Sequence, residues 1–296
     1  MNSNDFANYM TKNKFLVSDG ATGTNLIKRG LENGLSAEHW VLEKPDNIKQ
    51  LHLDFINAGA NIILTSTFGA SKIRLKQVGL EDNFININKK AVQIAKQAVG
   101  DKSVLIAGSI GPLGHMLKPL GTLEYDEAKK HYALQADLLI KSGVDILVVE
   151  TQFDLNEANA AIEGIRLNSN IALICSFSFD RGIKTMMGVS PANFAKSMSG
   201  LELSALGINC GKSLENNQKC LYELSNNTDL PIWFKPNAGL PKINDDGNPE
   251  YGVSPTGMAK NVASWINIGA SIIGGCCGTS PDHLSAIANS IYPLLK

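Results

Sequence analysis

The stretch Ser142-Gly143-Val144-Asp145-Ile146-Leu147-Val148-Val149-Glu150 joins the end of a predicted helix to a predicted buried strand. The segment before it, Glu124–Ser142, has the apolar spacing of a helix, and Gly143 stands where that helix should end. The run Asp145–Glu150 is nearly continuously apolar, which is typical of a parallel strand that is buried on both faces. This order of helix, turn and strand indicates an α/β protein.

The same unit recurs along the chain, because short apolar runs alternate with longer amphipathic segments. The predicted strands are Phe15–Asp19, Ile62–Thr67, Val104–Ser109, Asp145–Glu150, Ile171–Phe177, Ser204–Asn209, Ile232–Lys235 and Ser271–Gly275. The helical segments between them include Asp46–Ala58, Asn86–Ala98, Glu124–Ser142, Glu157–Leu167, Leu214–Asn226 and Met258–Ile268.

Eight strands that alternate with helices predict a single (β/α)8 TIM barrel, in one domain that spans residues 1–296. A doubly wound open sheet is the second choice, but it usually carries a Gly-rich phosphate turn and fewer strands. The segment Lys235–Pro255 is rich in turn residues, and we predict that it forms a long loop over the barrel mouth.

The composition excludes several classes of function. Lys and Arg number 27 and Asp and Glu number 28, so no excess positive charge is available to bind nucleic acid or an anionic membrane. Met1–Lys14 lacks the apolar run of a signal peptide, and no apolar stretch reaches the length of a membrane span. We therefore expect a cytoplasmic protein whose five cysteines are metal ligands, nucleophiles or core residues rather than disulfides.

Three cysteines follow predicted strands, whereas Cys175 and Cys220 fall inside predicted elements and are expected in the core. Cys210 follows the sixth strand, and Cys276 and Cys277 follow the eighth, so a barrel would bring their thiolates together at its carboxyl end. Zn²⁺ suits this set, because it binds thiolates in a tetrahedron and three protein ligands leave one catalytic position open. The alternatives are a redox disulfide or two small residues in a tight turn.

Two further features indicate an amino-acid ligand at the same end of the barrel. The turn Asp19–Thr24 leads into a helix, and its backbone N–H groups could hold a carboxylate. Glu150 ends a buried strand, where an unpaired charge is costly, so it should meet either a ligand ammonium or a structural Lys or Arg.

The chain resembles the homocysteine S-methyltransferase family over nearly its whole length. Two motifs, Pro-Asn-Ala-Gly-Leu-Pro at 236–241 and Gly-Gly-Cys-Cys-Gly-Thr at 274–279, are most similar to the homocysteine domain of cobalamin-dependent methionine synthase. The other segments that carry the resemblance, in chain order, are Asp19–Thr24, Ala58–Phe68, Gly108–Gly111, Asp145–Thr151 and Gly207–Cys210.

The resemblance implies a TIM barrel whose zinc ion is held at the carboxyl ends of the strands by Cys210, Cys276 and Cys277. It also implies that Asp19, Gly20 and Glu150 bind the amino-acid end of homocysteine and that Asn237 lines the pocket. Thr22 is a further substrate-binding candidate, although relatives often carry Met or another apolar residue at its position.

The implied reaction is attack of a zinc-bound homocysteine thiolate on a methyl donor, which forms methionine without a protein nucleophile or general base. S-Methylmethionine, S-adenosylmethionine and a methyl group delivered by a corrinoid protein are all candidate donors in the family. Nothing in the chain resembles the folate- and cobalamin-binding modules of methionine synthases or the extension of the betaine-using branch. The alternative functions are a non-catalytic zinc- or amino-acid-binding barrel, acting as a sensor or docking module, and a thiol-redox protein.

Overall fold

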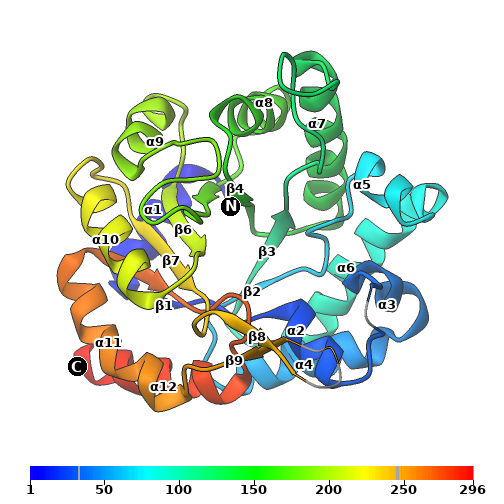
Figure 1. Cartoon of the computed structure of the whole chain (residues 1–296). Coiled ribbons are helices and arrows are strands. Elements are labelled where there is room, and N and C mark those ends of the chain that lie inside the picture. Colours follow the sequence, from blue (N-terminus) through cyan, green and yellow to red (C-terminus); the bar gives the residue numbers. More distant parts are fainter. Residues whose placement is uncertain (33, 245–246, 248, 296) are drawn as a thin grey trace.

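The computed structural model describes residues 1–32, 34–244, 247 and 249–295, and its main sheet contains eight parallel strands (Figure 1). The strand order is β1-β10-β7-β6-β5-β4-β3-β2. A parallel bridge between Ser18 and Ile62 connects the two ends of this order, so the sheet closes on itself. The strands are β1 (Leu16–Val17), β2 (Ile62–Leu64), β3 (Leu105–Ile110), β4 (Ile146–Gln152), β5 (Leu173–Phe177), β6 (Ala205–Cys210), β7 (Ile232–Pro236) and β10 (Ala270–Ile273).

Helices between the strands form a ring around the closed sheet, which confirms the predicted (β/α)8 TIM barrel (Figure 1). Short 3₁₀ turns, η1 (Glu81–Asn83) and η2 (Tyr292–Leu295), accompany them. Within the described residues, no helix is both long and apolar enough to cross a membrane. The helices are α1 (Ser3–Asn13), α2 (Thr22–Lys28), α3 (Ala37–Glu43), α4 (Pro45–Asn57), α5 (Lys72–Gln77), α6 (Phe84–Val99), α7 (Tyr125–Ser142), α8 (Leu155–Arg166), α9 (Pro191–Met198), α10 (Leu214–Ser225), α11 (Pro255–Ile268) and α12 (Pro281–Ile291).

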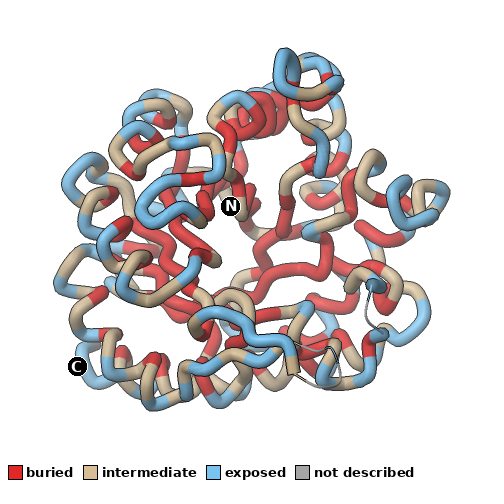
Figure 2. The backbone as a smooth tube through the Cα atoms, in the orientation of Figure 1, coloured by how far each residue is buried: buried red, intermediate tan, exposed pale blue. Residues whose placement is uncertain are grey.

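Apolar side chains pack in two layers, one inside the barrel and one between the strands and the helices. The strands are therefore buried on both faces, whereas the outer faces of the helices are exposed (Figure 2). This double burial explains why the strands read as continuous apolar runs rather than as alternating ones.

The period of two along each strand carries polar side chains to the inside of the barrel at its carboxyl end. Ile146 and Val148 belong to the inner apolar layer, so Glu150, two residues further along β4, also faces inward. Even spacing from the inner-layer residues of other strands likewise places polar side chains inside the barrel at its carboxyl end. These residues are Ser109, Ser176, Asn209 and Lys235.

Helix α1 closes the opposite, amino-terminal end of the barrel. Phe6 and Met10 are buried in the inner apolar layer, next to the side chains of the strands. The N-terminal ammonium donates a 2.8 Å hydrogen bond to the carbonyl of Asp145, and Asn2 pairs with Ile171 in a β-bridge. The barrel is thus a packed core below the polar residues of its mouth.

Two details differ from the sequence prediction. The segment Lys235–Pro255 is not a plain loop, because it contains the antiparallel hairpin of β8 (Pro241–Ile243) and β9 (Pro249–Tyr251). Residues 245, 246 and 248 in this segment lie outside the described residues. The first strand is shorter than Phe15–Asp19, because β1 forms ladder pairs with β10 only at two residues.

Replacing Phe6 by Ala should lower the free energy of unfolding by about 3–5 kcal/mol, because it opens a cavity at the base of the barrel. Urea unfolding followed by circular dichroism would measure the change. The control is Asn8→Ala on the exposed side of the same helix, which should change stability little. Equal effects of the two substitutions would show that α1 does not close the core.

Candidate active site

Three thiols meet at the carboxyl end of the barrel. The Sγ atoms of Cys210, Cys276 and Cys277 all lie within 4.8 Å of one another, and those of Cys210 and Cys276 are 3.0 Å apart. Cys210 ends β6 and the other two cysteines follow β10, with only β7 between these strands. Thiolates around a tetrahedral zinc ion would be about 3.8 Å apart, given a Zn–S distance of about 2.3 Å, so the donor set fits this metal.

The end of β7 and the residues after it hold both cysteine segments in place. The backbone of Pro236–Ala238 forms hydrogen bonds of 3.2, 2.9 and 2.9 Å with the backbones of Cys210, Cys276 and Cys277, respectively. The two cysteine segments, which are more than sixty residues apart in the sequence, are therefore fixed to the same short piece of chain.

Asn209 supports the cluster from inside the barrel. Its Nδ2 group donates to Thr151 Oγ1 at 2.8 Å and lies 3.5 Å from the Cys210 Sγ and 3.9 Å from the Cys276 Sγ. Its Oδ1 atom accepts from Ser176 Oγ at 2.6 Å and from Thr151 N–H at 3.0 Å. Both Thr151 and Cys210 have φ near +60°, a costly conformation that turns the end of each strand away from regular alternation. Cys210 can thus line the mouth although Asn209 before it faces inward.

The three thiols titrate together. Hydrogen bonds from Cys210 and Cys276 lower the pKa of Cys277 to about 3, whereas the pKa values of Cys210 and Cys276 are raised. The other two thiols thus favour the thiolate form of Cys277. A buried negative charge of this kind favours the binding of a cation.

The β8–β9 hairpin reaches the cluster through Tyr251. The phenol of Tyr251 is among the groups that lower the pKa of Cys277 through a side-chain hydrogen bond. The tyrosine ring packs directly on Gly278, where an added Cβ would lie 2.1 Å from the Tyr251 Cγ, and the φ of +83° also requires glycine. The glycine after the cysteine pair thus leaves room for the hairpin.

A buried ion pair lies beneath the cluster. Lys235 Nζ is 2.6 Å from Asp19 Oδ1, and both side chains are at most 3% exposed. The other Asp19 oxygen accepts a 2.7 Å hydrogen bond from the Leu64 N–H. Glu150 accepts a 2.5 Å hydrogen bond from the Ser109 hydroxyl and forms no ion pair within 4.0 Å among the described residues.

The charges of these groups follow from their burial and neighbours. Burial raises the pKa of Glu150 to about 7, against the attraction of Lys235 and the hydrogen bond from Ser109, which lower it. Burial alone would lower the pKa of Lys235, but Asp19 and Glu150 outweigh it and raise the value. Lys235 is therefore a fixed cation, and Glu150 can exchange its proton near neutral pH.

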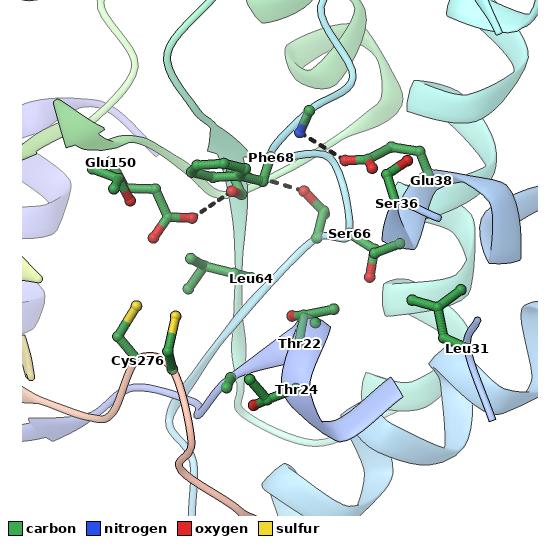
Figure 3. Close-up of a pocket in the computed structure, with 18 of the residues that line it drawn as sticks. Thr22, Thr24, Leu31, Ser36, Glu38, Leu64, Ser66, Phe68, Glu150 and Cys276 are labelled. Carbon is green, nitrogen blue, oxygen red and sulfur yellow. Dashed lines mark hydrogen bonds between the residues drawn. The ribbon is translucent and has the colours of Figure 1, made fainter. Parts of the chain in front are cut away.

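A cavity of about 540 Å³ opens above these groups (Figure 3). Cys276 and Glu150 lie at one end of it, and Leu31 and Glu38 lie at the other. Its wall is mostly apolar, as is usual for a small-molecule site. The cavity exceeds the needs of one small amino acid, so it leaves room for a second ligand.

The structure brings together most of the residues predicted from the sequence. Gly20, Thr22 and Glu150 line the same cavity as the three cysteines. Asp19 does not line it, because its carboxylate pairs with Lys235 below the floor. Asn237 does not line it either, because its side-chain amide donates a 2.9 Å hydrogen bond to the Gly211 carbonyl behind Cys210.

The site also contains residues that sequence reasoning did not assign to it. Lys235 and Asn209 were visible as polar ends of buried strands, and the period of two could have placed them inside the barrel. Phe68, Ser66 and Glu38 line the cavity from loops and a short helix, whose positions follow from tertiary packing alone.

Fold and site together define a (β/α)8-barrel enzyme with a three-cysteine candidate metal centre at the carboxyl ends of its strands. The sequence matches the family model described as "Homocysteine S-methyltransferase" over residues 16–291. The chain therefore belongs to this family and is a methyltransferase.

Individual relatives agree with this assignment. The chain is 28% identical over 295 residues to a methionine synthase of Mycobacterium leprae and to one of Mycobacterium tuberculosis, with 94% of this chain covered in each case. It spans only 24% and 25% of the length of these two relatives. The crystal structure of the homocysteine methyltransferase MmuM from Escherichia coli, in its metallated form, superposes with a TM-score of 0.82 at 25% identity, covering 95% of this chain and 98% of that one.

Replacing Lys235 by Met should lower the free energy of unfolding by about 3–5 kcal/mol, because Asp19 is left as an uncompensated buried charge. The double variant Asp19→Asn with Lys235→Met should recover most of this loss, because it removes both charges. Urea unfolding of the wild type, both single variants and the double variant would measure the coupling. Costs that simply add would contradict the assignment of a coupled pair.

Proposed function

We propose that this methyltransferase acts on the sulfur of homocysteine, with Zn²⁺ held by Cys210, Cys276 and Cys277. The observation that carries the proposal is the convergence of three thiols beside a buried carboxylate in one cavity. The family match, the methionine synthase relatives and the metallated form of the similar E. coli protein support it.

The cysteines supply a suitable donor set, because thiolates are preferred zinc ligands and three of them leave one position for a substrate thiol. When bound there, Zn²⁺ would lower the pKa of a coordinating thiol, so that the sulfur is a thiolate nucleophile at neutral pH. Asn209 would orient two of the cysteine sulfurs, and its position 3.5 and 3.9 Å from them supports that role.

Other residues would place the amino-acid end of homocysteine. Glu150 is the acid at the cysteine end of the cavity, and it forms no ion pair among the described residues, so it is assigned the ligand ammonium. Gly20 and Thr22 line the same cavity and are assigned contacts with the polar end of the ligand. Asp19 would act indirectly, because it holds Lys235 in the floor beneath the ligand. These contacts serve orientation, which is the contribution that this reaction requires from the protein.

The reaction forms a bond between the homocysteine sulfur and the methyl carbon, while the bond between that carbon and its carrier breaks. The electron pair of the broken bond leaves with the carrier, and the product is methionine. The carrier is either a small donor such as S-methylmethionine or S-adenosylmethionine, or a corrinoid protein.

Replacing any one of Cys210, Cys276 or Cys277 by Ala should abolish both zinc retention and methionine formation, because two thiolates are too few for this centre. Zinc content measured by mass spectrometry under reducing conditions tests this directly. The control is Cys220→Ala, which removes a buried thiol in α10 that belongs neither to the cluster nor to the cavity lining and should leave zinc bound. Full activity in a zinc-free variant would refute the role of the cluster, and a reversible disulfide without zinc would favour a thiol-redox function.

The Michaelis constant for homocysteine should fall as the pH rises through about 7, because Glu150 then ionises and attracts the ligand ammonium. In the Glu150→Gln variant, the Michaelis constant for homocysteine should stay high at every pH and should no longer fall near pH 7, while zinc stays bound. Initial rates of methionine formation between about pH 6 and pH 8 would show the difference. A variant that lost zinc but kept its affinity for homocysteine would contradict this assignment.

A further inference from the structure

Two threonine hydroxyls and the backbone of Ser109 form a closed ring of hydrogen bonds beside Glu150. The Ser109 N–H donates to Thr65 Oγ1 at 3.1 Å, and Thr67 Oγ1 donates to the Ser109 carbonyl at 2.7 Å. The hydroxyl oxygens of Thr65 and Thr67 are 2.6 Å apart. All three residues are buried, and Thr65 and Ser109 line the same cavity as the cysteine cluster.

The direction of every hydrogen bond in this ring follows from a count of protons. A hydroxyl group has one proton, and that of Thr67 goes to the Ser109 carbonyl. In the contact between the two hydroxyls, Thr67 therefore accepts and Thr65 donates. Thr65 Oγ1 also accepts from the Ser109 N–H, so the bonds run around the ring in one sense. Hydrogen bonds in such a chain polarise and strengthen one another.

The ring continues the link between two strands beyond the point where their backbone pairing ends. β2 and β3 pair in register as far as Leu64 and Ala107. Beyond these residues, the two threonine hydroxyls supply partners for the N–H and C=O groups of Ser109, which would be costly to bury unpaired. Gln135 of α7 anchors the ring from outside the barrel, because its amide donates a 2.8 Å hydrogen bond to the Thr67 carbonyl.

The consequence for Glu150 is a donor in a fixed position. With its backbone held by the ring, Ser109 donates its own hydroxyl proton to Glu150 Oε1 at 2.5 Å. Hydrogen bonds to a carboxylate are short and strong, so this one sets the orientation of the Glu150 side chain. Among the described residues, the second oxygen, Oε2, accepts no hydrogen bond. Glu150 lies on the same side of the cavity as Cys276 (Figure 3).

Toward the cavity, these side chains offer acceptors and no hydroxyl proton. The protons of Thr65 and Thr67 are used inside the ring, and that of Ser109 is used on Glu150. A carboxylate or another pure acceptor in a ligand would therefore find no donor among these four side chains. A protonated amine has three N–H groups and no acceptor, so it is the polar group that matches them.

We propose that Ser109, held by Thr65 and Thr67, is a positioning residue that makes the cavity selective for a thiol with an amino group. It acts through Glu150, because by orienting this carboxylate it places the charge that binds the ligand ammonium. A thiol of the same length without an amino group gains nothing from this arrangement. The inference rests on the proposed function, and it adds the residues that distinguish homocysteine from other small thiols.

The test is calorimetric titration of the zinc-loaded protein with homocysteine and with 4-mercaptobutanoate, which is homocysteine without its amino group. The wild type should bind homocysteine more tightly. Ser109→Ala should raise the dissociation constant of homocysteine by about tenfold and leave that of 4-mercaptobutanoate unchanged, because only the amine is recognised through Glu150. Zinc content should not change. With any donor that supports turnover, the Michaelis constant for homocysteine should rise by a similar factor at unchanged kcat.

Two further variants separate positioning from a general structural role. In the Glu150→Gln background, Ser109→Ala should cause no further loss of homocysteine affinity, because the group through which it acts has already been changed. Thr67→Val keeps the shape of the side chain but opens the ring, so it should weaken homocysteine binding about fivefold and leave 4-mercaptobutanoate unaffected. The matched control is Ser204→Ala, which removes a buried hydroxyl directly before β6, at the opposite end of the barrel, and should change neither constant.

Three results would overturn the role of Ser109 while leaving homocysteine as the substrate. They are unchanged homocysteine binding in Ser109→Ala, equal losses of affinity for the two thiols, and a loss that is as large in the Glu150→Gln background as in the wild type. A wild-type protein that does not bind homocysteine would overturn the proposed function as well. A protein that binds homocysteine with the expected selectivity but forms no methionine with any donor would support the role of Ser109 and overturn only the proposed methyl transfer.

Discussion

The site depends on a few backbone hydrogen bonds at the end of β7. Pro236–Ala238 binds the backbone next to Cys210 on one side and the backbone of Cys276 and Cys277 on the other. This arrangement is available only because β7 lies between β6 and β10 in a closed parallel sheet. Each cysteine segment alone is a glycine-flanked turn, but the shared strand makes them one cluster of sulfur atoms. The fold therefore brings the three candidate metal ligands together.

The interior of the barrel divides into a lower apolar part and an upper polar part, and the division sets the charges of the site. Trp233 closes the packed core, and Lys235, two residues later, stands in the polar layer. Its pairing with Asp19 fixes one positive and one negative charge, whereas Glu150 forms no ion pair among the described residues and would be available to the proposed ligand ammonium. A titratable acid next to a neutralised pair is a suitable recognition group for an ammonium, because its charge is not already satisfied by the protein.

The sequence was sufficient to predict the architecture and the cysteine cluster, because both follow from strand periodicity and from the order of strands in a barrel. Glu150 could be placed at the mouth for the same reason. The pairing of Asp19 with Lys235 could not be predicted, because it depends on which of several inward-facing groups come within reach across the barrel. The hairpin within Lys235–Pro255 and the position of Glu38 were also beyond reach, because both are set by packing between distant loops. Asn237 shows a similar limit: its motif was recognisable, but its side chain supports the Cys210 segment rather than facing the cavity.

Zinc K-edge X-ray absorption of the zinc-loaded protein tests the central claim most directly. The account predicts three sulfur neighbours and one lighter atom without substrate, and four sulfur neighbours at about 2.3 Å once homocysteine is added. A spectrum with fewer than three sulfur neighbours, or one that homocysteine leaves unchanged, would contradict the claim that Cys210, Cys276 and Cys277 hold the ion that receives the substrate thiol.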